Sequence, residues 1–205
     1  YMLKPLILAC ALTTSTLGAE KNVLAFAGST RENSSNIQLV TEAAEIAKQM
    51  GAKVTVVNLK DFPMPFYDAD LEAKEQLPPK AKELRQLMIQ NDVIFIASPE
   101  YNSSVSGILK NTIDWLSRNE KGEGSREAFK GKKFMIMSAS PGSTGGARGL
   151  VHLEAIISNI GGEVIPLKIS VKNSYEAFDE KGQLKDSEVR KQLQEAVKSA
   201  ISTTN

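Results

Sequence analysis

The chain has almost none of the side chains on which metal sites and nucleophilic catalysis most often depend. Cys10 is the only cysteine and His152 the only histidine among 205 residues. A single cysteine allows neither an intrachain disulfide nor a cysteine-based metal cluster. A nucleophile activated by histidine would have to use His152 alone. The sequence therefore disfavours metalloenzymes and Ser/His or Cys/His hydrolases, and we expect no metal site.

An excess of charge of one sign is also lacking. The 25 lysines and arginines balance 24 aspartates and glutamates, for a formal net charge of +1. No overall field attracts nucleic acid or an anionic membrane, so we expect no nucleic-acid partner. Any anion that the protein binds must be held by a local site. The 41% of hydrophobic residues is enough for a sizeable core.

Long hydrophobic runs are missing as well, and the longest apolar stretch lies near the start of the chain. Residues 2–19 have a basic residue at Lys4, an apolar stretch at 6–12 and small residues up to Ala19. This is the plan of a secretory signal peptide, and the stretch is too short to span a bilayer. The alternative is an uncleaved segment that packs on the domain or on a partner chain. We therefore treat 1–20 as a signal-like or extra N-terminal segment, and 21–205 as one domain.

From residue 21 onward, short apolar runs alternate with segments of helical periodicity. The run DVIFIA at 92–97 is almost continuously apolar, as in parallel strands buried on both faces. The alternation predicts a three-layer α/β fold with a five-stranded parallel sheet and right-handed crossovers. The expected strands are Asn22–Ala27, Lys53–Leu59, Asp92–Ala97, Lys133–Ser138 and Glu163–Ile169; the expected helices are Ser35–Met50, Lys80–Ile89, Gly107–Leu116, Leu150–Ile160 and Asp186–Ile201; the expected long loops are Asp61–Pro79 and Arg118–Gly131.

Polar segments follow the first, third and fourth expected strands, at the sheet edge where open α/β sheets bind ligands. The first, Gly28–Asn36, offers hydroxyl and amide groups, the positive charge of Arg31 and the free N–H groups of the helix that follows. It lacks both the Gly-Lys-Ser/Thr ending of a P-loop and the dinucleotide pattern G-x-G-x-x-G. The segment suits a single terminal phosphate; the alternative is an ordinary polar loop with a serine N-cap.

The other two polar segments suit a flat ligand. Residues 98–107 contain Pro99 and Gly107, which shape a stiff turn, with Tyr101 as a flat face and Asn102 as a hydrogen-bonding group. An isoalloxazine ring needs a frame of this kind. Residues 138–149 contain four glycines, which allow the backbone to approach a flat ligand closely. The alternatives are an ordinary strand–helix loop and a mobile surface loop.

Residues 22–169 resemble the NADPH-dependent FMN reductases, which include bacterial quinone, chromate and azo reductases and have a flavodoxin-like fold. The matching stretches are G-S-x-R-x-x-S-x-N at 28–36, P-E-Y-N at 99–102, L-K-N-x-I-D-W-L-S-R at 109–118 and the glycine-rich loop at 140–149. The resemblance implies that 21–205 is a flavodoxin-like FMN-binding domain. The residues that it assigns to the FMN phosphate are Ser29, Arg31, Ser34, Ser35 and Asn36, those that it assigns to the flavin ring are Pro99, Glu100, Tyr101 and Asn102, and those that it places over the other side of the ring are Ser140 and Gly142.

The same resemblance implies an activity. Hydride passes from NADPH or NADH to FMN, and then electrons pass to a small acceptor such as a quinone, free flavin, chromate or an azo compound. The flavin carries this chemistry, so we expect no catalytic acid or base from the protein. The family also implies a homodimer or homotetramer. NAD(P)H supply favours the cytoplasm, and a working signal at residues 2–19 would instead export the protein. The alternative function is a flavodoxin-type electron carrier that does not oxidise NAD(P)H directly.

Several other polar residues have plain structural interpretations. The Glu100 carboxylate is expected to face solvent or a subunit contact, His152 to lie on a helix surface or in packing, and Trp115 to lie in the core or a dimer contact. The acidic stretch at 68–72 is expected to be a solvated loop. Basic residues in the loop at 118–131 are left open as contacts for the NADPH phosphate or a partner subunit; they are Arg118, Lys121 and Arg126.

Overall fold

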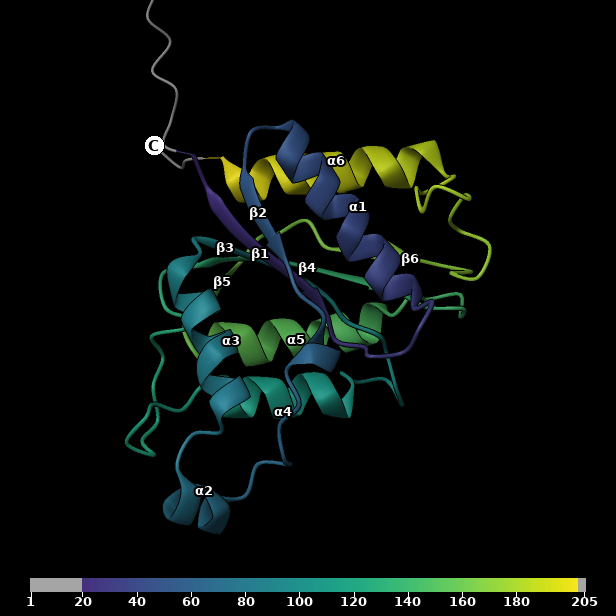
Figure 1. Cartoon of the computed structure of the whole chain (residues 1–205). Coiled ribbons are helices and arrows are strands. Elements are labelled where there is room, and N and C mark those ends of the chain that lie inside the picture. Colours follow the sequence, from purple (N-terminus) through teal and green to yellow (C-terminus); the bar gives the residue numbers. More distant parts are fainter. Residues whose placement is uncertain (1–19, 203–205) are drawn as a thin grey trace, which may run out of the picture.

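The computed structural model describes residues 20–202, so the signal-like interpretation of residues 2–19 lies outside the described part. A twisted parallel sheet occupies the middle of the molecule, with helices on both faces (Figure 1). The strand order is β2-β1-β3-β4-β5, and every pair of neighbours is parallel. The prediction of a flavodoxin-like α/β fold with a five-stranded parallel sheet is thereby confirmed. The strands are β1 (Asn22–Ala27), β2 (Lys53–Val56), β3 (Val93–Ala97), β4 (Lys133–Ala139), β5 (Glu163–Val164) and β6 (Ile169–Val171).

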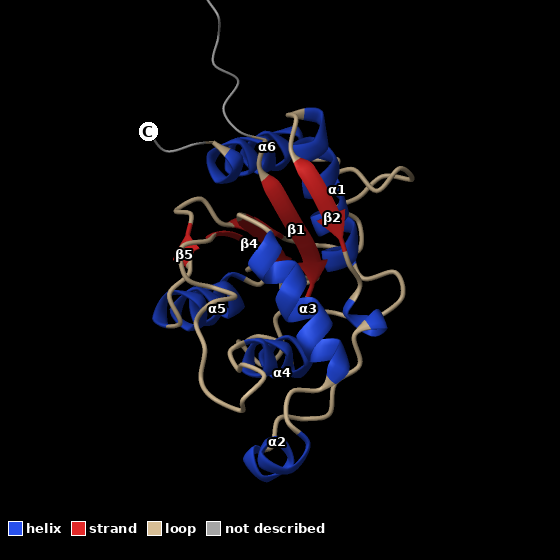
Figure 2. Ribbon diagram, turned by 60° about the vertical axis from the view of Figure 1, so that its left-hand side comes forward, coloured by secondary structure: helices blue, strands red, loops and turns tan. Residues whose placement is uncertain are grey.

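The central strands are buried on both faces, as their continuous apolar sequences predict. All five residues of β3 are buried, while β2 at the edge of the sheet is largely exposed. The two faces of the sheet each pack on their own helices (Figure 2). Helices α1 and α6 cover one face, and α3, α4 and α5 cover the other. The helices are α1 (Ser35–Gln49), α2 (Ala69–Glu75), α3 (Pro79–Gln90), α4 (Gly107–Leu116), α5 (Ala147–Asn159) and α6 (Ser187–Ile201).

Alternate residues of one strand enter opposite cores, because successive side chains of a strand point to opposite faces. Phe95 of β3 belongs to the core under α1 and α6, and its neighbours Ile94 and Ile96 belong to the core under α3, α4 and α5. Parallel register keeps each layer continuous across the sheet. Leu24, Ile94 and Phe134 are consecutive partners on one face. The two cores hold the strand ends in fixed positions, which matters because the loops at those ends carry the candidate site.

The expected fifth strand, Glu163–Ile169, is interrupted in the structure. Its two parts, β5 and β6, both pair with β4, with Val164 opposite Phe134 and Ile169 opposite Met137. Pro166 lies in the interruption, and a proline has no N–H to donate to the sheet. The second expected strand is also shorter, since Asn58 caps a 3-10 turn (η1, Leu59–Asp61).

The expected loop at 61–79 contains the short helix α2, which lies at the outer end of the layer of α3 and α4 (Figures 1 and 2). Asp68 caps this helix by accepting hydrogen bonds from the backbone N–H groups of residues 70 and 71. Trp115 of α4 is fully buried, and its indole N–H donates to the carbonyl of Pro65 at 2.8 Å. Trp115 therefore holds the segment that leads into α2. Within residues 20–202, no helix has the length and apolar composition needed to cross a membrane.

Candidate active site at the carboxyl edge of the sheet

A cavity of about 430 Å³ lies at the carboxyl ends of β1, β3 and β4. This is the edge where the strand order reverses between β1 and β3, and open α/β sheets bind ligands there. Nine of the eleven residues expected at the FMN site line it; the other two, Asn102 and Gly142, do not. The lining residues are Ser29, Arg31, Ser34, Ser35, Asn36, Pro99, Glu100, Tyr101, Ala139, Ser140, Pro141, Ser174 and Tyr175.

The β1–α1 segment forms the first wall through hydrogen bonds within itself. The Ser34 hydroxyl is the N-cap of α1 and accepts from the backbone N–H of Asn36 at 3.3 Å. The Ser29 hydroxyl accepts from the backbone N–H of Arg31 at 3.3 Å. Gly28 is needed for packing, since an added Cβ would lie 2.9 Å from the Cβ of Leu109 on α4. These contacts place the N-terminus of α1, with its partial positive charge, against the cavity.

Two polar side chains in this wall connect it to other parts of the molecule. The Asn36 amide donates to the carbonyl of Ala139 at 2.9 Å and accepts from the Ala139 N–H at 2.9 Å. The Ser35 hydroxyl donates to the carbonyl of Ser174 at 3.3 Å. The side chain of Asn36 is 3% exposed and its polar groups are already bonded. Asn36 therefore joins the first turn of α1 to the end of β4, and its amide is engaged with the backbone rather than directed at a ligand.

The side chain of Arg31 differs from that of Asn36 in both exposure and hydrogen bonding. Its side chain is exposed, lines the cavity and makes no hydrogen bond or ion pair with any residue from 20 to 202. The nearby Lys60 differs, because it pairs with Glu32 at 3.3 Å. An arginine held beside a helix N-terminus offers several N–H donors to an anion. Arg31 is thus available to bind a negatively charged group in the cavity.

The second wall carries an exposed aromatic ring on a tight turn. Tyr101 and Ser104 exchange two backbone hydrogen bonds, at 3.0 and 3.1 Å. Between them, Asn102 and Ser103 have φ of 51° and 64°, as in a type I′ turn. The Tyr101 side chain is 55% exposed and lines the cavity. Asn102 occupies the corner of this turn, which accounts for its absence from the cavity wall.

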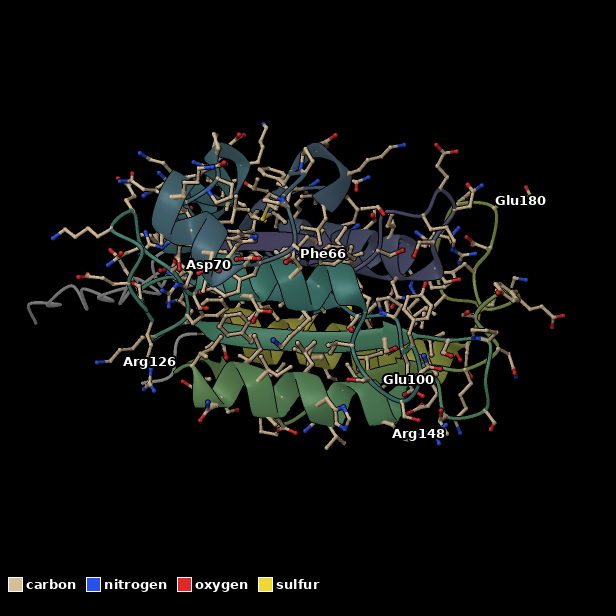
Figure 3. All side chains as sticks on the ribbon, turned by 90° about the horizontal axis from the view of Figure 1, so that it is seen from below. Phe66, Asp70, Glu100, Arg126, Arg148 and Glu180 are labelled. Carbon is tan, nitrogen blue, oxygen red and sulfur yellow. The ribbon has the colours of Figure 1, made fainter. Side chains whose placement is uncertain are left out.

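Glu100 was expected to face solvent or a subunit contact, and in the structure its carboxylate does not face solvent. Its side chain is 9% exposed, and its carboxylate accepts from the backbone N–H of Gly149 in the first turn of α5 at 2.9 Å. The Arg148 guanidinium lies 3.5 Å away, and Figure 3 shows the two side chains together at one end of the molecule. A carboxylate is stabilised at a helix N-terminus by the free N–H groups and the helix dipole. Glu100 therefore joins the second wall of the cavity to the third.

The third wall is the loop between β4 and α5, where glycine is required at one position above all. Gly146 has φ of 84°, and an added Cβ would lie 1.9 Å from the Ser138 hydroxyl. The loop contacts the cavity through Ser140, whose backbone N–H donates to the carbonyl of Val171 at 3.0 Å. Gly142 lies beyond this contact and does not line the cavity, although the resemblance implied that it would cover the flavin.

A fourth wall was not expected from the sequence. Ser174 and Tyr175, in the loop between β6 and α6, line the cavity next to α1. The sequence does contain a signal for this wall, because the loop also follows a parallel strand at the carboxyl edge. It was overlooked since the loop has neither the glycines nor the serine-rich run that marked the other three.

The other candidate residues lie elsewhere and have partners. Glu72 is 4% exposed, and it accepts hydrogen bonds from Arg118 Nε at 2.8 Å and from the Tyr67 hydroxyl at 3.0 Å. The hydrogen bond from Arg118 lowers the pKa of the Glu72 carboxyl below its ordinary value. Asp68 and Asp70 are exposed, as expected, whereas Glu72 is buried in helix α2 and paired with Arg118. In the part of the chain that the structure describes, no group of His, Cys, Asp and Glu is placed to hold a metal ion.

His152 lies on the exposed surface of α5, as the sequence suggested. Its Nδ1 is 2.9 Å from the hydroxyl of Ser104. This contact and that of Glu100 with Gly149 both connect the turn of Tyr101 to α5. His152 does not line the cavity, so it has no geometry for acid–base chemistry there.

Comparison with known proteins agrees with this arrangement. A family model described as NADPH-dependent FMN reductase matches residues 21–176. The NAD(P)H-dependent FMN reductase of Pseudomonas aeruginosa is 32% identical over 176 residues, covering 84% of this chain and 89% of that protein. A quinone reductase of Escherichia coli is 36% identical over 135 residues, covering 66% of this chain and 68% of that protein.

A solved structure is similar over nearly the whole chain. The flavoenzyme FerB of Paracoccus denitrificans, described as an NAD(P)H:(acceptor) oxidoreductase, superimposes with a TM-score of 0.74. Its sequence is 26% identical, and the match covers 88% of this chain and 95% of FerB. The region that the family model matches, residues 21–176, contains all four walls of the cavity.

Proposed function

The chain belongs to the NADPH-dependent FMN reductase family, and we propose that it is an FMN-dependent NAD(P)H oxidoreductase that reduces small acceptors. Quinones, free flavin, chromate and azo compounds are the acceptor classes that we consider. The observation that carries the proposal is the cavity at the carboxyl edge, which joins an arginine with no ion pair among residues 20–202 and a helix N-terminus to exposed aromatic rings. This combination suits a ligand with a phosphate at one end and a flat ring at the other.

The residues present fit FMN. At the phosphate end, Arg31 and the first turn of α1 supply a positive charge and N–H donors. At the ring end, Pro99, Tyr101 and the backbone near Ser140 supply flat and closely approaching surfaces. We assign Asn36 and Glu100 a different part, namely holding these surfaces at a fixed separation through the hydrogen bonds that they make.

FMN, when bound, supplies the hydride-accepting and electron-transferring chemistry. The protein's own residues bind and orient it. Glu100, the carboxylate in the cavity wall, is engaged with Gly149 and Arg148, and His152 lies outside the wall. We therefore assign no general acid or base. NADPH and NADH both remain candidate donors, and we propose a homodimer or homotetramer, which sedimentation equilibrium of the purified protein tests.

A flavodoxin-type electron carrier is the second candidate, because carriers share the fold and the phosphate-binding loop. Carriers tend to be strongly acidic, whereas this chain has a formal net charge of +1. Direct oxidation of NADPH separates the two. An absorption spectrum of the purified protein, recorded before and after addition of FMN and then of NADPH without oxygen, is the deciding experiment. We expect flavin bands that bleach promptly with NADPH. Bound flavin that does not bleach would support the carrier, and no flavin uptake would reject both.

A further inference from the structure

The loop between β6 and α6 is fixed against the cavity by contacts at both of its ends. Near β6, the backbone N–H of Ser174 donates to the carbonyl of Ser140 at 3.2 Å, and the Ser174 carbonyl accepts from the Ser35 hydroxyl at 3.3 Å. Near α6, the backbone N–H of Leu184 donates to the carboxylate of Glu42 at 2.8 Å. Ser174 is 3% exposed. The position of the loop is therefore set by α1 and by the β4–α5 loop.

Tyr175 is the next residue after Ser174, and its side chain has no hydrogen-bond partner within the described residues 20–202. It lines the cavity, it is 72% exposed, and it makes no hydrogen bond within residues 20–202. Asn173 has φ of 46°, so the chain turns sharply just before Ser174. A large aromatic side chain with a hydroxyl is thus held at the mouth of the cavity by backbone bonds that do not involve the side chain itself.

The neighbours of Tyr175 place it between two walls of the cavity. Ser174 bonds both to Ser35, the first residue of α1, and to Ser140 of the β4–α5 loop, so Tyr175 lies where the first and third walls meet, next to the N-terminus of α1. Tyr101 belongs instead to the turn after β3. Figure 3 shows Glu180, in the same loop as Tyr175, at the end of the molecule where Glu100 and Arg148 lie. A tyrosine hydroxyl near a helix N-terminus is a neutral donor to an anion.

We propose that Tyr175 is a cofactor-recognition residue that donates a hydrogen bond to the phosphate of FMN and so helps the site to select FMN over riboflavin. This inference rests on the proposed function. Arg31 and Tyr175 then contact the phosphate as a charged and a neutral donor, and the N–H groups of the α1 N-terminus supply the third contact. Riboflavin has the same ring but no phosphate, so it cannot use the Tyr175 hydroxyl in this way.

The test compares two flavins and two variants of the full chain freed of flavin. Dissociation constants for FMN and riboflavin are measured from the quenching of flavin fluorescence on binding. Tyr175→Phe removes only the hydroxyl, and we expect it to weaken FMN binding at least about tenfold, which is the usual effect of losing a hydrogen bond to a charged group. Riboflavin binding should change by less than about twofold. Because Tyr175 is largely exposed, the fold should be unaffected, and circular dichroism checks this.

Glu176→Gln is the matched control, since Glu176 is the exposed neighbour in the chain and does not line this cavity. It should leave both dissociation constants unchanged. The inference is overturned if Tyr175→Phe changes neither constant, or changes both by the same factor. Failure of the proposed function has a different signature, because wild-type protein would then bind neither flavin.

Discussion

Two groups of polar residues surround the same cavity, and they differ in where their hydrogen bonds go. Asn36 and Glu100 are nearly buried and bond to the backbone of neighbouring loops. Arg31, Tyr101 and Tyr175 are exposed, and their side chains make no hydrogen bond with residues 20–202. We call the first group, with Gly146, the framework residues and the second group the rim residues.

The difference teaches that lining a cavity and binding a ligand are separate properties. A framework residue keeps the loops at a fixed separation, so its loss should lower both protein stability and flavin affinity. A rim residue contributes little to folding, so its loss should lower flavin affinity alone. The first three substitutions below test that division, and all are given from the largest expected effect to the smallest.

Gly146→Ala should be the most damaging framework substitution. It forces a non-glycine residue into a left-handed conformation and places a Cβ 1.9 Å from the Ser138 hydroxyl. We expect a loss of about 3–4 kcal/mol in the free energy of unfolding, measured by urea denaturation. Gly142→Ala in the same loop is the control, because its Cβ would have no neighbour closer than 3.8 Å. Equal losses in the two variants would contradict the framework assignment of Gly146.

Asn36→Ala should have the next largest effect on stability. It leaves the buried N–H and carbonyl of Ala139 without partners, which costs about 2–3 kcal/mol of stability. FMN affinity should also fall, since the first turn of α1 and the end of β4 are no longer joined. Thr41→Ala, on an exposed position of α1, should change stability by less than about 0.5 kcal/mol. If Asn36→Ala weakened FMN binding at full stability, Asn36 would belong with the rim residues.

Arg31→Gln tests whether a rim residue contributes to flavin affinity alone. FMN affinity should fall about tenfold, because a charge-assisted contact to the phosphate is lost, while riboflavin affinity and thermal stability stay unchanged. Lys60→Gln is the control for a general loss of positive charge, since Lys60 is exposed near the same loop but does not line the cavity. An unchanged FMN dissociation constant in Arg31→Gln would show that the phosphate assignment is wrong.

Glu42→Gln should have the smallest effect and a dependence on pH. Burial raises the pKa of the Glu42 carboxyl above its ordinary value of 4.5, although Arg190 and the Leu184 N–H oppose the shift. The folded protein then holds this proton more tightly than the unfolded chain. Wild-type stability from this group is therefore greatest below pH 4.5 and falls as the pH rises through the raised pKa.

The glutamine variant lacks that titration, so its stability relative to wild type should improve as the pH rises from about 4.5. Urea denaturation at several pH values measures this difference. Glu72→Gln is a matched comparison with the opposite sign, since Arg118 lowers the pKa of Glu72 and its stabilising contribution is lost as the pH falls. Parallel pH profiles in the two variants would contradict this account.

The class of fold and the edge of the sheet that carries the site were predictable from the sequence. Strand residues such as those of 93–97 are apolar throughout because both of their faces are buried, and this pattern is visible in the chain itself. Parallel strands also bring their carboxyl ends to one edge. That rule is sufficient to bring Ser29, Tyr101 and Ser140 to one cavity although they lie far apart in the sequence.

The direction of individual side chains was not predictable in the same way. Glu100 was expected to face solvent or a subunit contact, and it bonds to the first turn of α5, because α5 lies close enough to bring the N–H of Gly149 to its carboxylate. The fourth wall was missed because its loop has no glycine-rich or serine-rich run, and the contact of Ser174 with Ser35, 139 residues away, exists only in the folded chain. Helix α2 was missed because seven residues carry too little periodicity to distinguish a helix from a loop.

The sequence by itself determined the alternation of strands and helices, the two-sided burial of the sheet and the three polar loops, since each depends on local patterns of apolar, polar and glycine residues. Only the tertiary structure decided which polar groups are used within the protein and which remain available to a ligand. That distinction depends on distances between segments such as 36 and 139 or 100 and 149, and such distances arise when the helices pack on the sheet.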